Sequence, residues 1–266
     1  MKGKTNINIR SGAVLALFIG GITLAGLFLL PYGYNDMNSE NRFLPPGISH
    51  LMGTDNFGRD VFSRIMAGSK YTLLVALFTV SGSAALGTVL GLLAGFAGGI
   101  PDEITMRLMD TLSAFPGILL ALVMVSLLDN SPPTLIIALL ILFTPGFTRI
   151  MRNGMLQYKS RDFVLAARIA GIPNYRIIFV HIFPNLLSQL LSASVLGLSN
   201  AILAESTMSY LGLGIQPPVP SWGRMLSESQ TFLFNAPWCA LAPGIMIMLT
   251  VLAFHYLGEG LRERTQ

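Results

Sequence analysis

The chain has 266 residues, of which 11% are charged and 52% hydrophobic, and its formal net charge is +4. Soluble domains ordinarily carry about 25% charged residues, so the composition excludes a soluble globular protein, and the mean hydropathy of +0.63 indicates an integral membrane protein. The apolar runs are long and do not alternate with polar residues, which predicts an all-α membrane protein. The single cysteine, Cys239, excludes an internal disulfide and offers no metal site by itself.

Six apolar runs have roughly the ~20 residues that a helix needs to cross a bilayer. They cover residues 14–30, 73–97, 111–128, 134–147, 177–203 and 238–257. The first run follows Lys2, Lys4 and Arg10 but lacks a small-residue cleavage pattern, so we interpret it as a retained anchor and not as a signal peptide. The fourth run is short, and Pro145 and Gly146 are predicted to end or kink it.

The distribution of basic residues predicts the orientation, because Lys and Arg accumulate in cytoplasmic segments. Six spans place both termini on one side, where twelve basic residues stand against five on the other side. We therefore expect a multi-pass protein of the cytoplasmic (inner) membrane with both termini in the cytoplasm. The outer segments, 31–70 and 205–236, contain GTDNFGRD and PPVPSWG, which predict ordered loops at an outer mouth.

The second run carries a small residue every four positions. The members are Ser83, Gly87, Gly91, Gly95 and Gly99. Positions four apart share one helix face, and a face without side chains lets another backbone approach closely. The stripe predicts a helix-packing surface, either with another helix of this chain or with another subunit.

The segment 149–176 is interpreted as a polar, basic loop that lies in water beside the membrane. It holds six of the seventeen basic residues and one acidic residue, Asp162. Residues 162–170 are predicted to form a short helix, which Gly171, Pro173 and Asn174 end. A stiff helix on the cytoplasmic face indicates a binding surface for a partner protein.

The sequence shows no group of residues that would allow the chain to catalyse a reaction by itself. The sequence has no complete phosphate-binding loop, no Lys, Arg or carboxylate in the middle of a span, and no serine with a His and acid partner. His50, His181 and His255 follow no metal-ligand spacing. Glu205, at the outer end of the fifth span, is interpreted as a cap or an ion-pair partner. We expect no catalytic residue, no metal and no cofactor bound by this chain.

Four stretches resemble permease subunits of ABC importers. Residues 162–185, DFVLAARIAGIPNYRIIFVHIFPN, are similar to the coupling segment of that family, with Ala166, Ala167, Gly171 and Pro184 at its characteristic positions. The stretches HLMGTDNFGRDVFSRIMAG (50–68), SYLGLGIQPPVPSWGRML (209–226) and GEGLRERT (258–265) resemble the oligopeptide, dipeptide and nickel branch. Within that branch the chain resembles the "C" type subunit.

The resemblance implies a type I importer permease fold with alternating access. It implies an anchor helix and outer loop over residues 1–70, a permease domain over 71–258 and a cytoplasmic tail over 259–266. The implied partners are a second homologous permease in a heterodimer, two ATPase subunits that hold ATP and Mg, and an extracytoplasmic substrate-binding protein. No nucleic acid is expected as a partner.

The resemblance also implies roles for single residues in the coupling segment. Ala166 and Ala167 are expected to dock into a groove of the ATPase, with Gly171 fixing the helix exit. Arg161, Arg168 and Arg176 are expected to pair with acidic residues around that groove. Leu165 stands where the family commonly has glutamate, which puts the specificity of ATPase pairing in question.

The cargo is left open between peptides and nickel or a nickel chelate. Polar side chains on the fifth span, above all Gln189 and Asn200 and also Ser188 and Ser192, are expected to line the pathway, although a helical serine also bonds its own backbone. A stand-alone channel or secondary carrier and a membrane-embedded enzyme are the alternatives from other classes. The absence of charged residues in the middle of the spans disfavours the first, and the absence of a nucleophile or metal constellation disfavours the second.

Overall fold

The computed structural model describes the backbone of residues 2–265 and the side chains of residues 7–264, and this range is helical apart from its loops and an isolated β-bridge between Thr54 and Asp60. Its longer helices are α1 (Lys2–Phe28), α2 (Val61–Ala97), α3 (Gly99–Ala114), α4 (Gly117–Leu127), α5 (Pro132–Lys159), α6 (Asp162–Ile169), α8 (Phe183–Tyr210), α9 (Trp222–Ser229) and α10 (Trp238–Thr265). Short helical segments are η1 (Ser39–Asn41), α7 (Asn174–Arg176), the π-helical η2 (Ile177–Ile182) and η3 (Gln230–Phe232).

Within the described residues, five helices are long and apolar enough to cross a membrane, and the third predicted span is a broken pair. The sequence predicted one continuous run over residues 111–128, but α3 and α4 meet there with a bend of 88°. The break lies at Phe115, whose backbone is extended because the following residue is Pro116. The pair counts as a sixth span only if both halves cross together.

The fourth predicted span is much longer than expected. Helix α5 contains Pro145 in its interior and continues to Lys159. Of the predicted end or kink at Pro145 and Gly146, the end is therefore wrong, as is the description of residues 149–159 as a loop. Pro145 is buried, and α5 packs against α2. This tertiary packing compensates for the backbone hydrogen bond that proline cannot make.

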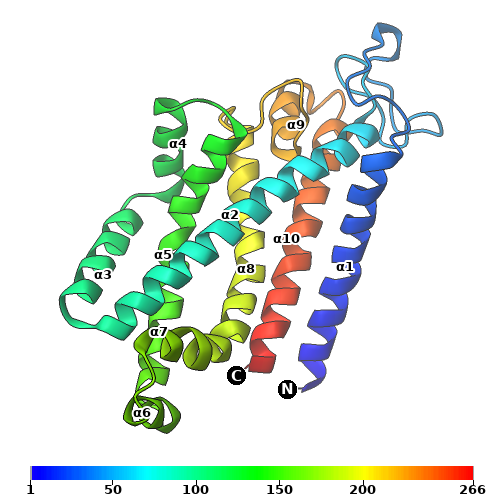
Figure 1. Ribbon diagram of the computed structural model, residues 1–266. Coiled ribbons are helices and arrows are strands. Elements are labelled where there is room, and N and C mark those ends of the chain that lie inside the picture. The colour runs from blue at the N-terminus through cyan, green and yellow to red at the C-terminus, as the bar shows by residue number, and fades with distance from the viewer. Residues whose placement is uncertain (1, 266) are drawn as a thin grey trace.

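The helices form a bundle with two unlike ends (Figure 1). Helix α2 contacts α5, α8 and α1, while α10 contacts α1 and α8. Helix α6 projects from one end of the bundle, where α1 begins and α10 finishes, and α9 lies at the opposite end. We refer to these as the α6 end and the α9 end. The predicted tail over 259–266 continues α10 as far as Thr265, and Gln266 lies outside the described residues, as do the side chains of Lys2 and Lys4.

The two segments at the α9 end are shorter than the predicted outer segments. Helix α2 begins at Val61 and α8 continues to Tyr210, so residues 61–70 and 205–210 are helical. Asp60 explains where α2 begins, because its side chain accepts a hydrogen bond from the backbone N–H of Ser63 over 2.7 Å. The segments between the long helices therefore cover about residues 29–60, with η1, and 211–237, with α9 and η3.

The stripe of small residues on α2 faces α5 of the same chain. A methyl group placed on Gly87 would lie 2.6 Å from Cβ of Phe147, and one on Gly91 would overlap the carbonyl oxygen of Thr148. Ser83 donates a hydrogen bond to the carbonyl oxygen of Leu140 over 3.0 Å. Gly95 also lies close to α5, against Met155. Gly99, by contrast, belongs to α3 and has open space beside it.

Replacing Gly91 by alanine is expected to lower the unfolding free energy of the full chain in detergent by about 1–3 kcal/mol, because α2 and α5 must separate. Gly21→Ala is the matched control, since Gly21 has open space where its Cβ would lie. It is expected to leave stability equal or up to ~1 kcal/mol higher. Thermal unfolding followed by circular dichroism measures both, and equal stability of the two variants would contradict the close approach of α2 and α5.

Candidate functional site

Helix α6 is a short helix whose charged residues suit its two ends and whose C-terminal end is capped by backbone hydrogen bonds. Asp162 lies in its first turn and Arg168 in its last turn, which suits the helix dipole. At its end, the N–H of Gly171 donates to the carbonyl of Arg168 and the N–H of Ile172 to that of Ala167, each over 3.0 Å. This is a Schellman motif, and Gly171 supplies the positive φ of 74° that it requires. The chain therefore leaves α6 in a fixed direction.

The two alanines of α6 point to different surroundings. Ala167 is 6% exposed and joins Val164 in a core cluster with Leu92 of α2 and Met151 of α5. Ala166 is exposed, as are Leu165 and Ile169, and Ile169 is 89% exposed. Small size at Ala167 thus serves the packing of α6 onto its own chain. We call Leu165, Ala166 and Ile169 the exposed strip of α6.

The three arginines expected to reach a partner also differ in their surroundings. Arg161 and Arg176 are exposed, and the backbone carbonyl of Arg176 contacts the ring of His181 over 3.2 Å. Arg168 places its guanidinium carbon 5.2 Å from the ring centroid of Phe96, at the end of α2. Arg168 is therefore engaged within the chain, while Arg161 and Arg176 flank α6 on its solvent side.

A groove of about 850 Å³ lies between α5 and α8. Gln189 and Asn200, which the sequence suggested for a pathway, both line it, and so do Ser188 and Ser192. Gln189 and Asn200 are eleven positions apart, which is about 16 Å along a helix. The hydroxyl of Ser192 donates to the carbonyl of Ser188 over 2.9 Å, so it satisfies itself within α8.

Several groove residues were not expected from the sequence. Gln157 of α5, Asn185 of α8 and Arg262 of α10 complete the polar lining near the α6 end. Gln157 lies in the segment that the sequence suggested was a loop, and its place on α5 follows only from the longer helix. The sequence did contain a signal for Asn185. Like Gln189 and Asn200, it is a carboxamide within a mostly apolar span, and such side chains are candidates for lining a groove.

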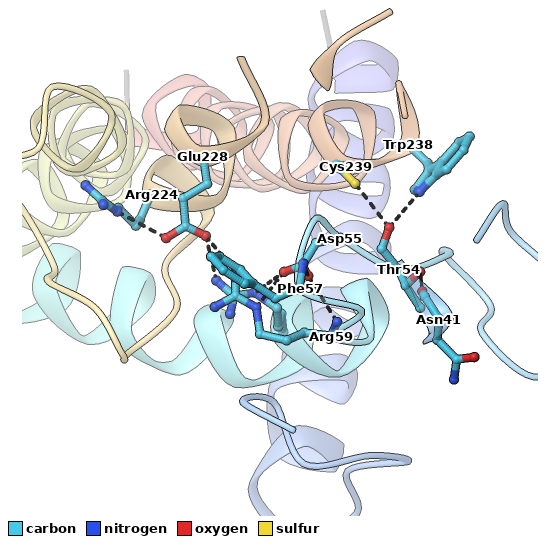
Figure 2. Close-up of polar contacts among 10 residues, drawn as sticks. Asn41, Thr54, Asp55, Phe57, Arg59, Arg224, Glu228, Trp238 and Cys239 are labelled. Carbon is cyan, nitrogen blue, oxygen red and sulfur yellow. Dashed lines mark hydrogen bonds and ion pairs between the residues drawn. The ribbon is translucent and has the colours of Figure 1, made fainter. Parts of the chain in front are cut away.

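At the α9 end, charged side chains bind the first loop to α9. Asp55 accepts hydrogen bonds from Nε of Arg59 over 2.6 Å and from the backbone N–H of the same residue. Glu228 of α9 accepts from Arg59 over 3.1 Å, from Arg64 over 3.0 Å and from Arg224 over 3.2 Å. Figure 2 shows Glu228 between Arg224 and Arg59. Two stretches far apart in sequence, 50–68 and 209–226, therefore meet in one polar network.

The same loop is fastened to α10 and α2. Trp238 donates from its ring nitrogen to the carbonyl oxygen of Thr54 over 3.1 Å, and Cys239 contacts that oxygen over 3.4 Å (Figure 2). His50 bonds Asp60, the residue that caps α2, over 2.9 Å. Asp60 thereby holds both the loop and the first turn of α2, so this end of the bundle forms a connected platform.

Glu205 has a different environment from the expected cap or ion pair. Its side chain is fully buried and accepts hydrogen bonds from the hydroxyls of Ser209 over 2.7 Å and Ser206 over 3.4 Å. Thr72 of α2 and Ser221, which precedes α9, present their hydroxyls to the same carboxylate. The residue points inward from α8 because hydroxyl groups on three elements replace the water that a carboxylate needs. It therefore ties α2, α8 and the start of α9 together.

Residues 87–266 match the family described as "Binding-protein-dependent transport system inner membrane component". Dipeptide transport system permease protein DppC of Alkalihalophilus pseudofirmus is 42% identical over 257 residues, which are 97% of this chain and 82% of the relative. The DppC protein of Haemophilus influenzae is 36% identical over 98% of this chain and 90% of its own.

A third relative differs in its named cargo. Glutathione transport system permease protein GsiD of Pectobacterium atrosepticum is 37% identical over 98% of this chain and 86% of the relative. The family match thus covers the groove, α6 and α9, and the relatives extend the similarity over nearly the whole chain, including Asp55, Arg59 and Arg64 of the network at the α9 end. With this coverage and an all-helical bundle of the type I permease fold, the chain belongs to the binding-protein-dependent transport system inner membrane component family, among the ABC importer permeases of the peptide branch.

Proposed function

We propose that this chain is one of two permease subunits of an ATP-driven importer, forms half of a peptide pathway and couples to ATPase subunits through α6. The observation that carries the proposal is α6 itself. It is a capped helix that leaves the bundle end and keeps Leu165 and Ile169 exposed. Apolar side chains on a charged, water-facing end are favourable when a protein partner covers them.

The distribution of charge supports an α6 end that faces the cytoplasm. This end carries Arg149, Arg152, Lys159, Arg161, Arg168 and Arg176 on α5, α6 and the segments around them. Basic residues next to membrane spans are retained on the cytoplasmic side. ATP and Mg would then be held by partner ATPases, which approach α6 from the cytoplasm, and the α9 end would face an extracytoplasmic binding protein.

The exposed strip of α6 is the part we assign to the ATPase. A groove on the partner would cover Leu165, Ala166 and Ile169, while Arg161 and Arg176 flank the strip and suit acidic residues at its rim. Ala167 has no part in this contact, because it packs inside the chain. Leu165, at a position where glutamate is common in the family, makes the contact more apolar.

The groove between α5 and α8 supports a pathway shared with a second permease. Gln189 and Asn200 are exposed on α8 in this chain, and carboxamides facing lipid would leave their hydrogen bonds unmade. A homologous subunit opposite the groove would enclose them with water or substrate. The heterodimer is thus the arrangement that accounts for a polar face inside the membrane.

The lining of the groove favours a peptide as cargo. Carboxamides and hydroxyls donate to and accept from peptide groups, whereas nickel is bound in proteins by imidazole, thiolate or carboxylate. None of the described residues that line the groove is His, Cys, Asp or Glu. The names of the relatives, dipeptide and glutathione permeases, agree with peptides of small size.

Ile169→Glu is expected to reduce peptide uptake by more than about tenfold, because an unpaired carboxylate would be buried against the ATPase. Uptake of a labelled dipeptide into proteoliposomes and co-purification of the ATPase subunits measure the two consequences. Membrane insertion should be unchanged, since Ile169 makes little contact within the chain.

The control for that variant is Ser160→Glu, which adds the same charge in the exposed turn before α6 and outside the strip. Its uptake should equal that of the unmodified complex. Full uptake by the Ile169→Glu complex, with the ATPases still bound, would show that α6 is not the coupling contact.

Gln189→Leu and Asn200→Leu are each expected to lower dipeptide uptake about three- to tenfold, since each removes a hydrogen-bonding group from the pathway. Asn153→Leu is the control, because Asn153 is an exposed carboxamide of α5 that does not line the groove. The same vesicles are assayed with radiolabelled nickel, for which no ATP-dependent uptake is expected. Nickel uptake without peptide uptake would contradict the cargo, and flux through vesicles that hold this chain alone, without ATP, would contradict the importer.

A further inference from the structure

The end of α2 is held by cations from α5 and α6, and the proposed function does not use this contact. Helix α2 ends at Ala97, and Gly98, with φ of 67°, turns the chain directly into α3. The last carbonyl groups of a helix have no partner within it. Lys159, the last residue of α5, donates to the carbonyl oxygen of Phe96 over 2.6 Å, so a positive charge caps the C-terminal end of α2.

The ring of Phe96 is contacted by cations from two different helices. Arg168 of α6 lies with its guanidinium carbon 5.2 Å from the ring centroid, and Nζ of Lys159 lies 5.8 Å from it. The ring also packs against the core cluster to which Val164 and Ala167 of α6 belong. One side chain therefore touches the end of α5 and the last turn of α6. We call Phe96, Lys159 and Arg168 the Phe96 clamp.

Helix α3 is tied to α5 by ion pairs. Asp102 of α3 accepts from Arg152 of α5 over 2.6 Å, and Asp110 accepts from Arg149 over 2.8 Å. Since the glycines of α2 also pack against α5, the three helices are joined along their length. Helix α6, by contrast, follows α5 after the two residues Ser160 and Arg161. A displaced α6 can pivot at that connection unless its far end is held.

We propose that the Phe96 clamp transmits movement of α6 to the corner between α2 and α3. Arg168 stands in the last turn of α6, away from the connection to α5, so its contact with Phe96 fixes the angle of α6 against the bundle. A displacement of α6 by the ATPase then moves α2 and α3 together with α5. Without the clamp, α6 would tilt, and its displacement would not reach α2 and α3. Phe96 is a positioning residue in this scheme, and the scheme rests on the proposed coupling of α6 to the ATPases.

The test is the number of peptides transported per ATP hydrolysed by the complete importer in proteoliposomes. Phe96→Leu keeps an apolar side chain but removes the aromatic face, and it should lower the ratio about fivefold while ATP hydrolysis and subunit assembly persist. Phe96→Tyr keeps the aromatic face and should restore the ratio. Arg168→Gln should resemble Phe96→Leu, and Arg168→Lys should retain part of the coupling.

A double variant separates one shared contact from two independent defects. Phe96→Leu combined with Arg168→Gln should be no worse than the poorer single variant, because both remove the same interaction. The matched control is Lys70→Gln, which removes a cation 5.6 Å from the ring of Tyr71 near the other end of α2 and should leave the ratio unchanged.

Several results would overturn the inference. An unchanged ratio in Phe96→Leu and Arg168→Gln excludes transmission through the clamp, while a defect in Ile169→Glu in the same assay keeps the proposed function. Loss of the ATPase subunits from the Phe96→Leu complex would show that Phe96 only supports the fold of α6. If the unmodified complex shows no ATP-dependent uptake, the proposed function fails and the inference fails with it.

Discussion

The close approach of α2 and α5 is the contact on which the rest of the bundle depends. Where α2 carries Gly87 and Gly91, backbone and Cβ atoms of α5 lie at distances that a methyl group would forbid. Because lipid gives helices no hydrophobic reason to associate, close packing of this kind is a main source of helix association in a membrane. Along this contact α5 continues as a helix past Pro145 and out to Lys159. The α6 end is built on that extension.

The two ends of the bundle are stabilised by different chemistry. At the α9 end, the partly buried Glu228 binds the buried Arg59 and Arg64. Such a network tolerates little displacement, because the loss of Glu228 as a partner would leave buried positive charges. At the α6 end, Lys159 and Arg168 contact a carbonyl oxygen and an aromatic face. Each of these contacts is weaker than a buried ion pair, and together they hold α6 against the end of α2. The α9 end is thus fastened by ion pairs within the loops, and the α6 end by contacts that converge on one side chain, Phe96.

Features encoded by neighbouring residues could be predicted from the sequence. The short helix before Gly171 was expected because Gly171, Pro173 and Asn174 cannot continue it, and the structure ends α6 at Ile169. The stripe on α2 was visible from its spacing of four, although its partner was not. The cytoplasmic role of α6 and the residues that would contact an ATPase stay predictions.

Features that depend on tertiary contact could not be predicted in this way. Pro145 has the same local preference for ending a helix whether or not α2 packs beside it, so the length of α5 was hidden. The break in the third span was signalled by Pro116 but was concealed by apolar residues on both sides of it. Phe96 is one of sixteen phenylalanines, and nothing near it in sequence distinguishes it. Its importance appears only when α5 and α6 fold back against the end of α2.

The polar groove constrains how the molecule exists in a membrane. A lone chain would expose Gln189 and Asn200 to hydrocarbon, at a cost of several kcal/mol for each unsatisfied group, on the order of the stability of a whole domain. The chain therefore needs a neighbour that is also polar along the matching face. In the proposed function, a homologous permease with a matching groove satisfies this condition, and two different sequences would allow the two halves to contact substrate unequally. The groove would then be half of a site whose chemistry is completed by assembly.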